Sequence, residues 1–126
     1  MAAEKRTVLI IDDEELNLKL VRKLLAMEGC LVVEARNAAS GVELARSSRP
    51  SLILMDIRLP DMDGLAATRI LKGDPVTRDV PIVVLSAYAM EEDKARAAEA
   101  GCAGYITKPF ELQAFRRTIR QFLGVR

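Results

Sequence analysis

The stretch LILMDIRLPDMDG, residues 52–64, runs from four apolar residues into a single aspartate, Asp56. A continuous apolar run of this kind is typical of a strand that is covered on both faces. A carboxylate inside such a layer would be very costly without partners. We therefore expect Asp56 where the strand leaves the core, followed by a loop that contains Pro60 and Gly64.

Similar apolar runs recur along the chain and alternate with segments of helical spacing. The runs occupy residues 8–11, 31–35, 52–55, 82–85 and 104–107. Helices are expected over residues 16–27, 38–45, 65–72, 90–100 and 112–122. This alternation predicts an α/β fold, a doubly wound sheet of five parallel strands with five helices on its two faces. Without a repeat or a linker, the chain is expected to be one domain over residues 1–126, with its core within about residues 7–123.

The predicted first and fourth helices differ in their apolar content. The first has an apolar stripe at helical spacing, closed by Gly29 as a helix stop and made of Leu16, Leu20, Leu24 and Met27. The fourth, within MEEDKARAAEA, has high helix propensity but few large apolar side chains. Because an alanine-rich face buries little area, this helix is expected to be held weakly and to shift at little cost.

The predicted last helix combines an apolar stripe with basic residues. Its apolar positions are Leu112, Phe115, Ile119 and Phe122. Its outer side is expected to carry Arg116, Arg117 and Arg120. These arginines would form either an ordinary solvated face or a surface for an acidic partner.

The composition excludes several classes of function. With 19 Lys and Arg against 18 Asp and Glu, the net charge is +1, and no general attraction to nucleic acid or to an anionic membrane is expected. No apolar stretch approaches the roughly 18 residues that span a bilayer, and MAAEKRTV lacks the apolar segment of a secretory signal. A cytoplasmic location is therefore expected.

The reactive side chains are restricted as well. The chain has no histidine, which removes Ser-His-Asp and Cys-His catalysis and most transition-metal sites. Cys30 and Cys102 form no CxxC pair and are expected to be reduced, buried or half-buried thiols. Any chemistry must therefore use carboxylates, hydroxyls and lysines.

Polar side chains follow four of the five predicted strands. They are Asp12, Asp13, Asp56, Ser86 and Lys108. Because the carboxyl ends of parallel strands lie along one edge of a sheet, and ligands bind there in open α/β folds, we expect these groups to converge. Two unit charges about 5 Å apart repel by roughly 3 kcal/mol at an effective dielectric constant near 20. Lys108 offsets only part of this repulsion.

A hard divalent cation would relieve the remaining repulsion. Oxygen ligands without histidine suit Mg²⁺, with Mn²⁺ as an acceptable substitute, whereas Ca²⁺ requires more protein ligands. A carboxylate beside a metal ion and a lysine is also arranged for phosphoryl transfer. Asp56 is the candidate nucleophile, because it stands alone on the central strand while Asp12 and Asp13 can hold the metal.

Four blocks of sequence resemble the receiver domain of two-component response regulators, a CheY-like, flavodoxin-like fold. They are IIDDE, LILMDIRLPDMDG, VVLSA and YITKPF, in the order and spacing of that family. The likeness extends over residues 8–123 and implies the strand order 2-1-3-4-5. DDEELNLKL and LSAYAM also bear a loose likeness to stand-alone members that steer the cell cycle through kinases.

The resemblance implies a set of metal and phosphoryl ligands. Asp56 would be the phosphoacceptor and, with Asp13, a side-chain ligand of Mg²⁺. The backbone carbonyl of Arg58 would be a third ligand, and Asp12 would act through metal-bound water. Lys108 would pair with the phosphoryl group.

It also implies a switch. Ser86 would move toward the phosphoryl group, and Tyr105 would change rotamer with it. The peptide bond between Lys108 and Pro109 would be cis, which is uncommon for X-Pro bonds in general.

The function implied is a phosphorylation-dependent signalling switch. A sensor histidine kinase or a histidine phosphotransfer protein would donate the phosphoryl group, since this chain has no histidine. The chain would catalyse only its own phosphorylation and dephosphorylation and would not otherwise be an enzyme. The face formed by residues 90–100, 104–107 and 112–122 would then change and regulate a protein partner, because no effector domain is expected after Arg126.

Other interpretations remain open. A phosphohydrolase of the haloacid-dehalogenase-like group would need an aspartate two residues after the nucleophile, where this chain has Arg58. A receiver-like scaffold that is never phosphorylated would have no need of the acidic residues and Lys108. Asp12 and Asp61, taken singly, could merely cap the helices that follow them.

Overall fold

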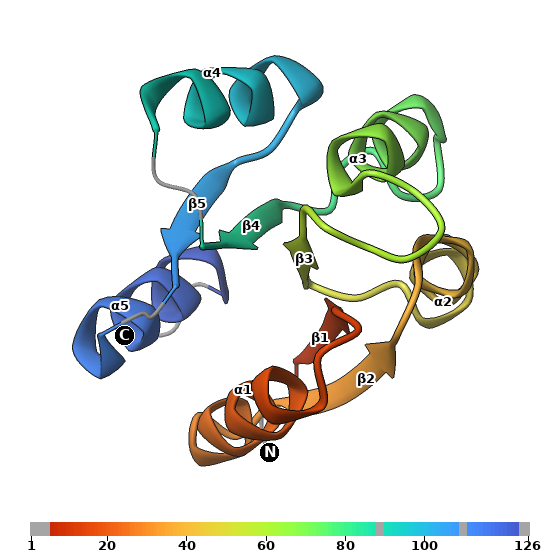
Figure 1. The fold of residues 1–126 in the computed structure, drawn as a ribbon. Helices are drawn as coiled ribbons and strands as arrows, with labels where there is room; N and C mark the ends of the chain where they lie inside the picture. Colours follow the sequence, from red (N-terminus) through yellow and green to blue (C-terminus); the bar gives the residue numbers. More distant parts are fainter. Residues whose placement is uncertain (1–5, 88–89, 109–110, 124–126) are drawn as a thin grey trace.

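The computed structural model describes residues 6–87, 90–108 and 111–123 (Figure 1). Strands and helices alternate along this part of the chain, as predicted. The strands are β1 (Thr7–Ile11), β2 (Leu31–Ala35), β3 (Leu52–Asp56), β4 (Ile82–Ser86) and β5 (Gly104–Thr107). The helices are α1 (Glu15–Met27), α2 (Ala38–Ser48), α3 (Gly64–Gly73), α4 (Glu91–Ala100) and α5 (Leu112–Leu123).

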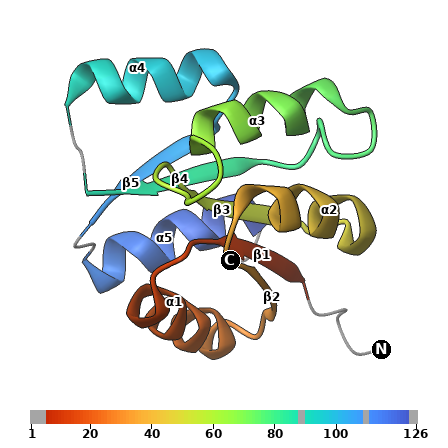
Figure 2. The same ribbon diagram turned by 45° about the vertical axis from the view of Figure 1, so that its right-hand side comes forward.

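The strands form one parallel sheet in the order β2-β1-β3-β4-β5. The fold class and the strand order are therefore confirmed. Helices α2, α3 and α4 cover one face of the sheet, while α1 and α5 cover the other (Figure 2). Because β3 lies at the centre, its last residue, Asp56, is placed in the middle of the edge where the strands end.

Alternation of side chains along each strand divides the core into layers. In β1, Val8 and Ile10 pack with the residues of α1 and α5, whereas Leu9 and Ile11 pack with those of α2 and α3. All four side chains are fully buried. The apolar runs of the sequence therefore supply both layers at once, as expected for a strand covered on both faces.

Helix α1 turns a different face to the sheet from the one predicted. Leu16, Leu20 and Met27 have exposed fractions of 76%, 48% and 64%. The side chains that face the sheet are instead Leu18, Val21 and Leu25, each fully buried. Of the predicted stripe, only Leu24 packs against this core layer, and it is half-buried. The prediction was wrong because α1 carries two apolar stripes of similar spacing, and periodicity alone does not say which of them meets the core.

Helix α5 buries Phe115 and Ile119, as predicted, but exposes 44% of Leu112. Its basic residues are not simply an outer face. Arg116 and Arg120 both bind the carboxylate of Glu28, at the end of α1, with nitrogen–oxygen distances of 3.1 and 2.5 Å. The Glu28 side chain is only 5% exposed, and hydrogen bonding from Arg120 lowers its pKa against the opposing effect of burial. This ion-pair cluster ties α5 to α1.

Helix α4 is packed through small side chains. Its buried residues are Ala97 and Ala100, which meet Leu65 and Val84 in a small apolar cluster. The predicted shortage of buried apolar area is confirmed for this helix.

Two further predictions concern the cysteines and membrane insertion. Cys30 and Cys102 are half-buried and unpaired, as expected. Among the described residues, no helix combines the length and the apolar character that crossing a membrane requires.

Gly64 provides a test of how closely the loop after β3 packs. A Cβ atom at this position would lie 2.2 Å from the carbonyl oxygen of Asp56 and 2.9 Å from Cα of Ile57. We expect Gly64→Ala to lower the free energy of unfolding by roughly 1–3 kcal/mol in denaturant titrations, because backbone must move. Gly73→Ala, in the same helix but with open space around its Cβ, should change it by less than about 1 kcal/mol. Equal effects at the two glycines would contradict this interpretation.

Candidate functional site

Three carboxylates meet at the edge of the sheet where the strands end. Asp12 and Asp13 follow β1, and Asp56 ends β3. One oxygen from each can be chosen so that all three lie within 4.8 Å of one another. Asp12 is fully buried, Asp56 is half-buried and Asp13 is exposed. The structure thus brings together the acidic residues that the sequence predicted.

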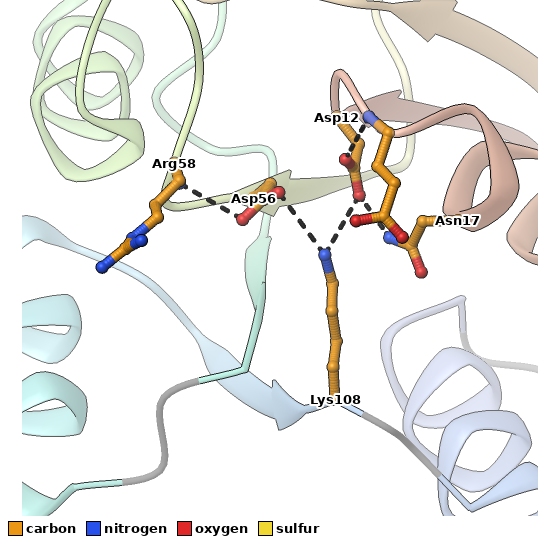
Figure 3. A network of polar contacts seen from close by, with 6 residues as sticks. Asp12, Asn17, Asp56, Arg58 and Lys108 are labelled. Atoms are coloured by element: carbon orange, nitrogen blue, oxygen red, sulfur yellow. Dashed lines mark hydrogen bonds and ion pairs between the residues drawn. The ribbon is translucent and has the colours of Figure 1, made fainter.

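Lys108 reaches into this acidic cluster from the end of β5 (Figure 3). Its Nζ lies 3.3 Å from Oδ2 of Asp12 and 3.4 Å from Oδ2 of Asp56. The backbone N–H of Lys108 donates to the carbonyl oxygen of Ser86 at 2.7 Å, which fixes the lysine against the end of β4. The ammonium group therefore offsets part of the negative charge of Asp12 and Asp56, which lie at the ends of two different strands.

Asp12 is held from α1 by a residue that sequence reasoning missed. The amide Nδ2 of Asn17 donates a hydrogen bond to Oδ2 of Asp12 (Figure 3). The other oxygen, Oδ1, accepts from the backbone N–H of Glu14 at 3.0 Å. Asn17 is 7% exposed. The available signal was an asparagine on the helix that follows the acidic pair, at a position between the two apolar stripes of that helix.

The loop after Asp56 presents backbone rather than side chain to the site. The N–H of Arg58 donates to Oδ1 of Asp56 at 3.2 Å, while the Arg58 side chain extends away from the cluster (Figure 3). Arg58 also lines a cavity of about 190 Å³, together with Asp93 and Arg96 of α4. The predicted role of the Arg58 carbonyl as a metal ligand stays a prediction.

Neither aspartate suggested as a cap serves the helix that follows it in the expected way. Asp12 binds Glu14, which precedes the first residue of α1. The cap of α3 is Asp63, whose Oδ1 accepts from the N–H of Leu65 at 2.7 Å. Asp61 accepts hydrogen bonds from the first turn of α2 instead.

Ser86 and Tyr105 lie on neighbouring strands. Ser86 is 2% exposed at the end of β4, and Tyr105 is half-buried in β5. In the pairing of these strands, Ser86 is opposite Thr107 and Tyr105 is opposite Val84. Alternation therefore puts Ser86 and Tyr105 on the same face of the sheet, two positions apart. The predicted cis bond involves Pro109, which lies outside the described residues, and it stays a prediction.

Burial and neighbouring charge make ionised Asp56 costly. Burial is the largest factor that raises the pKa of Asp56 above its ordinary value, and the Asp12 carboxylate adds to the rise. The charge of Lys108 and the Arg58 N–H act in the opposite direction but do not cancel the effect. The cost of burying the charged Asp56 carboxylate therefore remains in the protein alone.

The donor set suits a hard divalent cation. Among the described residues the cluster offers carboxylate oxygens from Asp12, Asp13 and Asp56, and the chain contains no histidine to compete. Oxygen ligands and an excess of negative charge are what Mg²⁺ requires, with its remaining positions filled by water. The residues present thus fit such an ion.

Comparison with known proteins agrees with this fold and site. The sequence profile of the response regulator receiver domain matches residues 8–120. The polar-differentiation response regulator DivK of Brucella anthropi is 42% identical over 119 residues, covering 94% of this chain and 97% of that protein. DivK of Brucella ovis is 40% identical with the same coverage.

Solved structures give the same result. A putative response regulator from Chloroflexus aurantiacus superposes with a TM-score of 0.91 at 26% identity, covering 96% of this chain and 99% of that one. The receiver domain of a sensor histidine kinase from Pseudomonas aeruginosa superposes with a TM-score of 0.88 at 30% identity and the same coverage. The latter was solved with a magnesium ion coordinated in its active-site cleft.

The fold and the acidic edge define a CheY-like signalling domain of the two-component systems. The chain belongs to the response regulator receiver domain family, and it is similar to DivK over nearly its whole length.

The raised pKa of Asp56 predicts a stability gain on removing its charge. We expect Asp56→Asn to raise the melting temperature in metal-free buffer at neutral pH by an amount corresponding to roughly 1–3 kcal/mol. Lys108 would keep its contact with Asp12. Because the folded-state pKa is raised, the penalty is absent below the unfolded-state pKa and develops as the pH rises through the folded-state value. The gain should therefore vanish in acid.

Differential scanning calorimetry at neutral and acidic pH measures this gain. Asp13→Asn, at an exposed carboxylate of the same cluster, is the control and should give a smaller shift. A lower melting temperature for Asp56→Asn at neutral pH would show that the carboxylates are not crowded.

The bond from Asn17 to Asp12 predicts a loss of stability. Asn17→Ala removes a hydrogen bond to a charged and fully buried acceptor, so we expect a loss of about 1.5–3 kcal/mol in denaturant titrations. Lys19→Ala, on an exposed position of the same helix, should cost much less. Similar losses in the two variants would mean that Asn17 acts only through the helix.

Proposed function

We propose that this protein is a phosphorylation-dependent switch that accepts a phosphoryl group on Asp56 in the presence of Mg²⁺. The observation that supports it is the geometry of the edge: a half-buried carboxylate on the central strand with Lys108 Nζ 3.4 Å from its Oδ2. Two further carboxylates lie beside it. This is the arrangement that transfer to a carboxylate requires, because both the nucleophile and the charge that stabilises the phosphoryl oxygens are in place.

The ion would be held by the side chains of Asp13 and Asp56 and by the carbonyl of Arg58, with Asp12 acting through bound water. When bound, Mg²⁺ would neutralise charge on the carboxylates and on the phosphoryl oxygens. The magnesium-containing receiver domain from Pseudomonas aeruginosa supports this choice of ion. Mn²⁺ is kept as an alternative to compare with it.

The proposed reaction uses a phosphohistidine of another protein as donor, a sensor histidine kinase or a histidine phosphotransfer protein. An oxygen of Asp56 attacks phosphorus, the bond from phosphorus to the histidine nitrogen breaks, and the electron pair stays with the leaving imidazole, which takes up a proton. Lys108 would shift its contact from the Asp56 carboxylate to a phosphoryl oxygen. The protein acts on itself and is not proposed to turn over a substrate, apart from the later loss of its own phosphoryl group.

The output would be a change in the face formed by α4, β5 and α5. Ser86 would donate its hydroxyl to a phosphoryl oxygen, and Tyr105, on the same face of the sheet, would respond to that movement. The packing of α4 through Ala97 and Ala100 supports this part of the proposal, because few apolar contacts resist displacement of the helix. A downstream protein would bind the altered face.

The similarity to DivK supports a role in regulating other proteins, and the particular kinase and output partner stay open. The cytoplasmic location expected from the sequence stays a prediction. The phosphohydrolase alternative gains no support, since Arg58 follows Asp56 at the position where a second aspartate would be needed.

Intact-mass spectrometry after incubation with acetyl phosphate and Mg²⁺ tests the proposal. We expect wild-type protein to gain the mass of one phosphoryl group, and omission of the metal or Asp56→Ala to abolish the gain. Asp79→Ala, at an exposed carboxylate distant in sequence from the cluster, should be modified like wild type. Unmodified wild-type protein would favour a receiver-like scaffold, whereas steady turnover of a phosphomonoester would favour a phosphohydrolase.

A further inference from the structure

The loop between β3 and α3 is closed at its base. The N–H of Gly64 donates to the carbonyl oxygen of Ile57 at 2.7 Å, and Arg58 and Asp63 form an isolated antiparallel bridge. The two ends of the loop, after Asp56 and before α3, therefore lie side by side. The backbone of Arg58 lies on the outgoing arm of this loop.

Asp61, near the tip of the loop, is bonded to the first turn of α2. Its Oδ1 accepts from the N–H of Ala38 at 2.8 Å, and its Oδ2 accepts from the N–H of Ala39 at 3.0 Å. These two bonds lower the pKa of Asp61 and so favour its charged form. Negative charge at the N-terminus of a helix is also favoured by the helix dipole.

The helix needs Asp61 because its own cap satisfies only part of the first turn. The side chain of Asn37 accepts from the N–H of Ser40 at 2.8 Å, and the Asn37 carbonyl accepts from Gly41. The N–H groups of Ala38 and Ala39 have no acceptor within a helix. Ala38 is fully buried, so an unpaired N–H there would be costly. Helix α2 and the loop after the acceptor are therefore fastened to each other.

We infer that Asp61 is a positioning residue for the metal site, because it braces on α2 the loop that carries the Arg58 carbonyl. The inference rests on the proposed function, in which that carbonyl is a metal ligand. Leu59 and Met62, on either side of Asp61, pack partly buried against the core layer of α2 and α3 and hold the loop down. Apolar contacts are not directional, whereas the two hydrogen bonds that Asp61 accepts from adjacent N–H groups are. These bonds therefore fix the position of the loop tip along α2.

The experiment compares two variants that each remove a cap from the same helix. Asp61→Ala removes the brace, while Asn37→Ala removes the bond to Ser40 and leaves the loop untouched. Both should lower the melting temperature. Only Asp61→Ala should raise the dissociation constant for Mg²⁺, by about tenfold in calorimetric titrations, as is typical for loss of a residue that orients a ligand. Asp61→Asn, which keeps one acceptor oxygen, should lie between Asp61→Ala and wild type.

A second measurement needs no metal. In metal-free protein, hydrogen exchange at the N–H groups of Arg58 and Gly64 should be several-fold faster in Asp61→Ala than in wild type and unchanged in Asn37→Ala. Unchanged affinity and unchanged exchange in Asp61→Ala would overturn the inference, as would equal effects of the two variants. Wild-type protein that takes up no Mg²⁺ would overturn the proposed function, and the exchange comparison would then decide by itself whether Asp61 braces the loop.

Discussion

Negative charge gathered at the carboxyl edge of a parallel sheet is the constraint on which the rest of the site depends. Parallel strands all end on the same side, so residues that follow β1 and β3 meet there although they are far apart in sequence. Lys108, at the end of β5, lies within 3.4 Å of two of these carboxylates and offsets part of the repulsion. The remaining charge and the burial of Asp56 leave a site that suits a hard divalent cation.

The surrounding elements hold this cluster through hydrogen bonds rather than through apolar packing. Asn17 and the N–H of Glu14 occupy both oxygens of Asp12, and the Arg58 N–H binds Asp56. Each of these bonds restricts the orientation of a carboxylate in the cluster. Asp61 bonds the loop after Asp56 to α2 and so connects this network to a helix that has no residue in the acidic cluster.

The two helices next to β5 are attached in different ways. Helix α5 buries Phe115 and Ile119 and is joined to α1 by the ion pairs of Glu28. Helix α4 rests on two alanines in a small apolar cluster. Because α4 buries so few apolar contacts, we expect it to be displaced from the sheet at a lower cost in free energy than α5. A response at Ser86 and Tyr105 would therefore be passed to α4 more readily than to α5.

The sequence by itself determined the fold class, the five strands and the convergence of Asp12, Asp13, Asp56 and Lys108. Continuous apolar runs that alternate with helices indicate a parallel sheet. In such a sheet the polar residues that follow the runs must lie along the same edge. Only the tertiary structure decided which stripe of α1 is buried, and it also showed that Asn17 reaches Asp12. Only the tertiary structure, too, showed that Asp61 caps α2 rather than the helix that follows it. Periodicity describes spacing along one element, whereas these contacts depend on how separate elements are oriented and on which unpaired N–H groups they leave within reach.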